Sequence, residues 1–141
     1  MNKLNYLITL IFISFLSPVA LAEQNVTWFH CPHVDEIKKI NTTSDLEATT
    51  TINGVTIKWR GWIQSTNYPN QFTHVYFEGM QAPWVITCAY KDAAGNYGML
   101  APQFAEYKSD GKTTGSWSGR ICYHSDPRSC NFSVIHNDVK L

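Results

Sequence analysis

The chain has 141 residues, with 11 basic and 11 acidic side chains and a formal net charge of zero. The charges are scattered, so the sequence carries neither the basic footprint of a nucleic-acid-binding protein nor an acidic tail. The length suits one domain with a core of its own, and we expect no nucleic-acid partner.

The first 22 residues have the organisation of a secretory signal peptide. Lys3 provides a positive start, Leu7–Leu16 is almost wholly apolar, and Ala20-Leu21-Ala22 is a small-x-small cleavage site. The apolar run is short for a bilayer span, although a retained N-terminal anchor is the alternative. The sequence therefore predicts a signal peptide over residues 1–22 and a single secreted or periplasmic domain over residues 23–141, with no membrane attachment after removal of the leader.

Four cysteines follow the leader: Cys31, Cys88, Cys122 and Cys130. An even count in an exported chain indicates disulfides, and four cysteines allow three pairings. We favour Cys31–Cys88, which ties the N-terminal segment to a central strand, with Cys122–Cys130, which closes a short loop. A zinc site is the competing interpretation, but the spacings lack a C-x-x-C pair and export disfavours free thiolates. We expect neither a metal nor another cofactor.

Short N-terminal elements precede the first long strands. Asn25–His30 is expected to be a strand or an extended arm. In the next segment, residues 32–41, Pro32 suits a first helical position and Val34, Ile37 and Ile40 lie three residues apart. The sequence predicts a helix of about two turns there, which the sheet and Cys31 would have to stabilise.

Leu46–Trp62 carries the strongest local signal. Asn53-Gly54 separates two alternating runs, and Asn-Gly favours a type I′ turn because both central residues need positive φ. A two-residue turn predicts the register, with an apolar face and a polar face. The expected pairs are Ile52 with Val55, Thr50 with Ile57, Ala48 with Trp59, Thr51 with Thr56, Thr49 with Lys58, and Glu47 with Arg60.

Further strands are expected between turn signals at roughly ten-residue spacing, which is typical of sandwiches and barrels. In the strand Gln71–Phe77 we place Phe72, His74 and Tyr76 on one side and the intervening residues on the other. The predicted class is all-β, an antiparallel sandwich or small barrel of about seven to eight strands with a short N-terminal helix. The remaining expected strands are Trp84–Lys91, Tyr97–Ala101, Gln103–Lys108, Ser116–His124 and Asn131–His136.

Aromatic residues in polar loops are the candidate binding residues. Exposed rings beside amide and hydroxyl groups suit a sugar or a peptide, because the ring supplies flat apolar area and the polar groups set orientation. The alternative is that these rings only cap the ends of the β-structure. The candidates are Trp62, Asn67, Tyr68, Asn70 and Trp117.

No catalytic motif is present, and we predict no catalytic residues. The His30-Cys31-Pro32-His33 segment resembles a ligand cluster, but a disulfide removes the thiolate. His74 could be a buried residue or a general base, and a glycosidase pair would draw on Glu78 with Glu106 or Asp92. The sequence contains no G-x-S-x-G, H-E-x-x-H or P-loop pattern.

The signal peptide, Cys31-Pro32, the Trp-rich middle, Cys88-Ala89-Tyr90 and the terminal cysteine pair resemble a family of small exported bacterial proteins known only as a domain of unknown function. The resemblance implies a bacterial source and a periplasmic or secreted destination, and it provides no catalytic residues. We predict a non-catalytic binding module for an extracytoplasmic protein or glycan, with a small secreted hydrolase or a secreted effector as alternatives. The ligand and the oligomeric state are not predicted.

Overall fold

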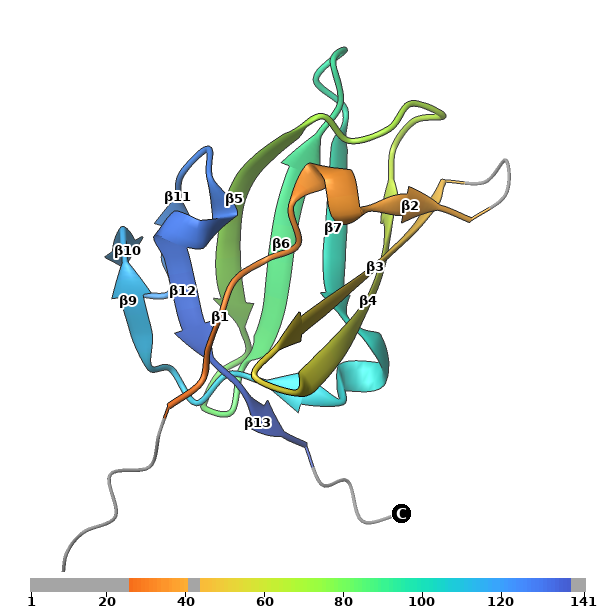
Figure 1. Cartoon of the computed structure of the whole chain (residues 1–141). Coiled ribbons are helices and arrows are strands. Elements are labelled where there is room, and N and C mark those ends of the chain that lie inside the picture. Colours follow the sequence, from red (N-terminus) through yellow and green to blue (C-terminus); the bar gives the residue numbers. More distant parts are fainter. Residues whose placement is uncertain (1–25, 41–43, 138–141) are drawn as a thin grey trace, which may run out of the picture.

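The computed structural model describes residues 26–40 and 44–137, and the expected signal peptide lies outside these ranges. The described chain forms antiparallel β-sheets and short 3-10 turns (Figure 1). None of its helices is long and apolar enough to cross a membrane. The strands are β1 (Trp28–Phe29), β2 (Lys38–Lys39), β3 (Asp45–Ile52), β4 (Val55–Ile63), β5 (Gln71–Glu78), β6 (Val85–Lys91), β7 (Tyr97–Pro102), β8 (Tyr107–Lys108), β9 (Thr113–Gly115), β10 (Trp117–Ser118), β11 (Ile121–Tyr123), β12 (Cys130–Ser133) and β13 (Ile135–His136).

The main layer is an eight-stranded sheet in the order β10-β11-β5-β6-β7-β4-β3-β2. A three-stranded sheet, β1-β12-β9, covers one side of it, and β1 passes in front of β5 in Figure 1, with β12 next to β1. The chain passes from the small sheet to the large one between β9 and β10, at Gly115 with its positive φ of 101°. The arrangement confirms the predicted antiparallel all-β class and is sandwich-like. We call the side of the large sheet turned towards β1 and β12 the inner face, and the other side the outer face.

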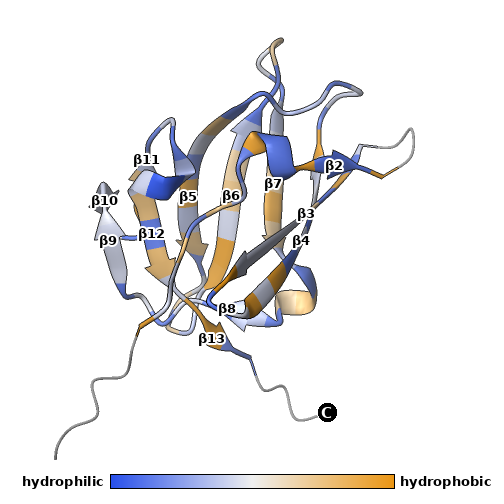
Figure 2. Cartoon of the chain, in the orientation of Figure 1, coloured by the Kyte–Doolittle hydropathy of each residue, from blue (hydrophilic) through white to orange (hydrophobic). Residues whose placement is uncertain are grey.

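The β3–β4 hairpin has the register predicted for it, from Ile52 opposite Val55 to Glu47 opposite Arg60. Asn53 and Gly54 have φ values of 50° and 78°, as the two-residue turn requires. On the inner face, the indole nitrogen of Trp59 donates to Thr50 Oγ1 at 2.9 Å, so this buried ring has its polar partner. Hydrophobic and hydrophilic residues alternate along β4 in Figure 2, in keeping with one dry and one wet face.

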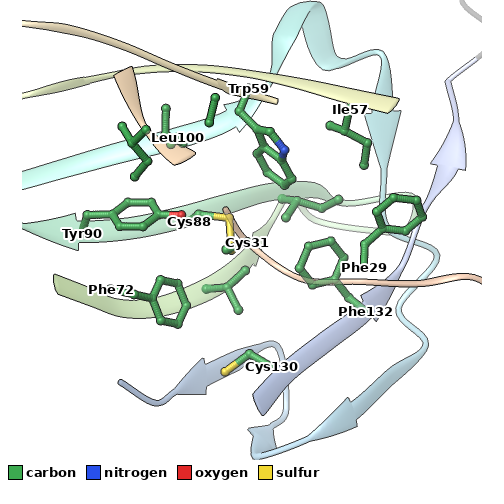
Figure 3. Packing of buried hydrophobic residues seen from close by; sticks show 14 of the residues in the cluster. Phe29, Cys31, Ile57, Trp59, Phe72, Cys88, Tyr90, Leu100, Cys130 and Phe132 are labelled. Carbon is green, nitrogen blue, oxygen red and sulfur yellow. A yellow bond between two sulfur atoms is a disulfide. The ribbon is translucent and has the colours of Figure 1, made fainter. Parts of the chain in front are cut away.

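The core lies between the two sheets. Figure 3 shows Trp59, Phe29 and Phe132 pointing into one interior space, with Cys31 beside them. Both favoured disulfides form: Cys31–Cys88 joins the N-terminal arm to β6, and Cys122–Cys130 joins β11 to β12. The Tyr90 hydroxyl donates to the Pro32 carbonyl at 2.7 Å and provides a second link between β6 and the arm. Such disulfides point to an oxidising environment outside the cytoplasm.

The predicted N-terminal helix was wrong. Only Val34–Glu36 forms a 3-10 turn (η1), with His33 as its N-cap, and the chain then extends into β2. Extension lets Lys38–Lys39 pair with β3 and places Ile37, 5% exposed, in the core. Strand pairing and burial of Ile37 replace the bonds that another helical turn would have made.

Three of the predicted strands are also different. Residues 103–105 form a 3-10 turn (η2) in which Phe104 and Ala105 have positive φ, so only Tyr107–Lys108 of that segment is a strand. The predicted strand over residues 116–124 is a hairpin of β10 and β11 that turns at Gly119, which has a φ of 59°. The last predicted strand is interrupted at Val134 between β12 and β13. The first two breaks follow from positive φ values, which hydrophobic alternation does not encode.

Two loops at one end of the sheet are tied together through Asp92, which is 2% exposed. Its carboxylate accepts hydrogen bonds from Ser65 Oγ at 2.6 Å, from the Ala94 amide and from both nitrogens of Asn96 at 2.9 Å, with Asn67 Nδ2 further away at 3.4 Å. The bonds from Ser65 and Asn96 outweigh burial and hold the pKa of Asp92 well below its ordinary value. Asp92 therefore fixes the β4–β5 loop against the β6–β7 turn.

We expect Asp92→Asn to lower the free energy of unfolding at pH 7. Because the pKa of Asp92 is lower in the folded chain, its contribution is complete above the unfolded value of 3.8 and is lost as pH falls through the folded value. Urea unfolding between pH 7 and pH 2 should show the gap between wild type and variant closing on acidification. Asp35→Asn, on the exposed η1 turn, is the control and should not reproduce this closing gap. A constant gap for Asp92→Asn would contradict the assignment.

The two disulfides should contribute unequally to stability. Their sequence separations are 57 and 8 residues, for which the chain-entropy model gives about 4 and about 2.5 kcal/mol respectively. Because all four cysteines are buried, the paired Cys→Ala variants leave comparable cavities. Urea unfolding should therefore show a larger loss for Cys31→Ala/Cys88→Ala than for Cys122→Ala/Cys130→Ala. The reverse order would show that native packing, and not loop closure, dominates.

Candidate ligand-binding face

The outer face of the large sheet carries a row of residues in register across five strands. The ladders pair Tyr123 with His74, His74 with Ala89, Ala89 with Met99, and Met99 with Trp62. Their side chains project to the same side because paired residues in adjacent strands share a face. This row brings together residues 62 and 123, which are far apart in the sequence.

A β-bulge turns His74 to this face. The β5–β6 register shifts between Phe72 and His74, which leaves Thr73 as an extra residue. Phe72 consequently joins Val75 on the inner face, and His74 joins Tyr76 on the outer face. Our expectation that Phe72, His74 and Tyr76 share one side was therefore wrong for Phe72, since strict alternation does not anticipate a bulge.

Several rings are exposed on the outer face. Tyr123 is 66% exposed, Tyr97 49% and Trp62 43%. His74 lies between two tyrosines, with ring centroids 5.6 Å from Tyr76 and 5.1 Å from Tyr123. These contacts hold the rings of β5 and β11 in fixed positions, so part of the face is preorganised for a flat ligand.

The middle of the face is low because β6 carries small side chains there. Ala89 is completely buried and Thr87 is 6% exposed, although both project outward. The Tyr76 hydroxyl reaches across β6 to the sulfur of Met99, with an oxygen–sulfur distance of 3.6 Å. Larger side chains on β5 and β7 thus stand over a floor formed by β6, and the Tyr76–Met99 contact crosses it.

Two hollows adjoin Met99 on this face. The larger hollow, about 540 Å³, is lined by residues that include His74, Lys91, Tyr97, Tyr123 and His124. The smaller hollow, about 220 Å³, includes Trp62, Arg60 and Glu78. Ligand sites commonly occupy about 300–1,000 Å³, so the larger hollow can hold a small ligand or one unit of a chain.

The hydrogen bonds of His74 define its tautomer. Thr73 Oγ1 donates to the Ala89 carbonyl at 3.1 Å, so it accepts from His74 Nδ1 at 2.9 Å. The proton is therefore on Nδ1, and Nε2 is left to accept from a ligand. Partial burial lowers the pKa of His74 and favours this neutral form.

Tyr76 stays protonated on the same face. Burial, followed by the nearby Glu78, raises the pKa of Tyr76 to about 12. Its hydroxyl therefore remains a hydrogen-bond donor at neutral pH.

Only one of the five sequence-predicted binding residues lies in these hollows: Trp62, at the end of the row. Asn67, Tyr68 and Asn70 lie in the β4–β5 loop. Asn67 is engaged with Ser65 and Asp92, and the Tyr68 ring, 60% exposed, lies 5.6 Å from Lys39 Nζ. The structure thus assigns a loop-bracing contact to Asn67 and leaves the Tyr68 ring accessible.

Trp117 lies apart from the other four, within the inner packing. Its ring centroid is 4.6 Å from that of Phe77 and 6.4 Å from that of Phe132, and its indole nitrogen donates to the Asn131 carbonyl at 2.9 Å. These contacts explain Trp117 as a residue that packs against the core.

The other candidates do not assemble into a reactive centre. His30 Nδ1 donates to the carbonyl oxygen of the adjacent Cys31 at 2.8 Å, and His33 caps η1. Within residues 26–40 and 44–137, no three His, Cys, Asp or Glu side chains are grouped so as to hold a metal ion. Of the suggested carboxylates, Asp92 is the loop brace, Glu106 pairs with His136 at 3.5 Å, and Glu78 lies on the outer face.

A further hollow of about 520 Å³ lies at one end of the molecule, between Phe29, Val55 and Tyr107. Its rim includes Val26 and His136, close to both limits of the described chain. The outer face is therefore the better-defined candidate.

Sequence reasoning missed Tyr97, Met99, Lys91 and Tyr123 as site residues. Alternation alone could have placed each of them on one side of its own strand. It could not show that β11 lies beside β5, or that β7 lies between β6 and β4, which is what gathers them.

Comparisons of the chain with protein-family models, with curated proteins and with solved structures find no match.

Proposed function

We propose that this protein is an exported, non-catalytic binding module whose outer sheet face binds a glycan. The observation that carries the proposal is the set of exposed rings around a preorganised hollow on that face. The leader predicted at residues 1–22 and the two disulfides support a destination outside the cytoplasm. The resemblance to small exported bacterial proteins is consistent with this proposal.

The shape of the face favours a glycan over a protein as ligand. A sugar ring has a flat apolar side and a hydroxylated edge, which match a tyrosine ring beside polar groups. The Tyr76–Met99 contact divides the face into two small hollows, which suits separate ring-sized units. A protein interface usually needs a more continuous surface of about 800 Å² per partner.

The geometry does not favour the hydrolase alternative. Thr73 and His74 are 2.9 Å apart, but the Thr73 hydroxyl donates to a backbone carbonyl and accepts from the imidazole. A nucleophile paired with a general base needs the opposite direction of donation. The pair therefore positions the ring of His74.

We expect alanine variants of Tyr97 and Tyr123 each to weaken glycan binding by about two- to tenfold, the range expected from loss of one ring contact. A glycan array with the mature, oxidised protein would identify a ligand, and titration by intrinsic Trp fluorescence would give the affinities. Phe104→Ala is the matched control, because Phe104 is 90% exposed on η2, away from the hollows. It should bind as wild type.

Tyr68→Ala separates two locations for the site. Full binding by this variant supports the sheet face, whereas loss of binding with no effect of Tyr97→Ala would place the site on the β4–β5 loop. Absence of any glycan ligand, with a protein partner captured instead, would refute the proposed function.

A further inference from the structure

The two hollows of the outer face differ in charge. The larger hollow is lined by Lys91 and two histidines, and no carboxylate is among its lining residues. The smaller hollow contains Glu78 and Arg60, and Arg60 pairs with Glu47 at 3.3 Å. Because Gln71 and Glu78 are opposite ends of β5, the acidic side chain is remote from the Lys91 end of the face.

Lys91 lies beside Tyr97, one of the exposed rings of the hollow. It pairs with Tyr97 on β7 and with Gln71 on β5, so its side chain projects from the outer face between them. No ion pair joins Lys91 to a carboxylate of the described residues. The adjacent Asp92 is turned into the loop network, where its carboxylate already has its donors. An ammonium group is therefore available to a ligand at the edge of the hollow.

The two histidines offer complementary hydrogen-bonding groups. Nδ1 of His124 accepts from the Asp126 amide at 3.0 Å, so the proton of the neutral ring is on Nε2, which is a donor. His74 has the opposite tautomer and presents Nε2 as an acceptor. The hollow can thus accept from a ligand hydroxyl at one ring and donate to a ligand oxygen at the other.

We propose that the larger hollow binds a saccharide unit that carries a carboxylate, with Lys91 as its counter-ion and the rings of Tyr97 and Tyr123 against the sugar. This inference rests on the proposed glycan-binding function and adds the class of ligand. Charge complementarity supports this ligand class. A neutral unit would leave the ammonium group without an ionic partner, whereas a carboxylate would pair with it in a hollow whose lining has no carboxylate to repel the ligand.

The test compares matched acidic and neutral probes on the mature, oxidised protein. Suitable acidic probes are tetragalacturonate, a hyaluronate tetrasaccharide and sialyllactose. Their neutral counterparts are the methyl esters of the first two, and lactose for the third. We expect at least one acidic probe to bind about tenfold more tightly than its neutral counterpart, as for a partly exposed ion pair. Its affinity should also fall as the salt concentration is raised from about 20 to about 300 mM, because salt screens the ion pair.

Variants of Lys91 identify the counter-ion. Lys91→Gln should lose about tenfold in affinity for the acidic probe and leave any binding of the neutral counterpart unchanged, whereas Lys91→Arg should retain most of the affinity. Lys58→Gln is the control, because it removes the same charge from the exposed polar part of β4, opposite Thr49. It should bind as wild type, and circular dichroism with urea unfolding confirms that each variant is folded.

Two outcomes would overturn the inference while the proposed function stands. One is that acidic and neutral probes bind with equal affinity, and that Tyr97→Ala weakens this binding whereas Lys91→Gln does not. The other is displacement of the acidic probe by acetate at equal concentration, which would mean that Lys91 binds any anion. Failure of every glycan on the array would instead refute the proposed function itself.

Discussion

The structure depends on the unequal sides of β6. Towards the core, this strand presents Ile86, Cys88 and Tyr90, all of them fully buried. Cys88 and Tyr90 bind the N-terminal arm through a disulfide and a hydrogen bond to Pro32. Towards the outside, the same strand presents Thr87 and Ala89, which are too small to fill the space between β5 and β7. One strand therefore anchors the covering layer on its inner side and forms the floor of the candidate site on its outer side.

Rigidity around this floor has several independent sources. Asp92 joins the β4–β5 and β6–β7 loops at the end of β6, through side-chain and backbone donors. The Cys122–Cys130 disulfide holds β11, and with it Tyr123, to the small sheet through β12. His74 stacks on Tyr76 and makes a tilted ring contact with Tyr123, and these contacts limit the rotamers of the three rings. A face held in this way loses little conformational entropy on binding, which benefits affinity for small ligands.

The β-bulge at Thr73 has the largest effect on the chemistry of the face. It changes which side of β5 faces the core and supplies the hydroxyl that orients the His74 ring. Without the extra residue, His74 would lie on the side of Phe72, and the outer face would lose its acceptor. Bulges are often found beside functional sites because they re-aim a side chain without disturbing the rest of the sheet.

Local signals in the sequence determined the β class and the register of the β3–β4 hairpin. Asn53-Gly54 is sufficient for the hairpin because its turn and both strands are contiguous. The number of cysteines indicated two disulfides but allowed three pairings, and the structure selected the favoured one. The prediction of an N-terminal helix failed because strand pairing to β3 and burial of Ile37 override the helical spacing of the apolar residues in that segment. Trp62 could be nominated from the sequence, whereas Lys91, Tyr97 and Tyr123 could not be joined to it. Only the tertiary structure decided the strand order and the bulge, because both depend on pairing between segments that are distant in sequence, and a face of a sheet exists only once those pairs form.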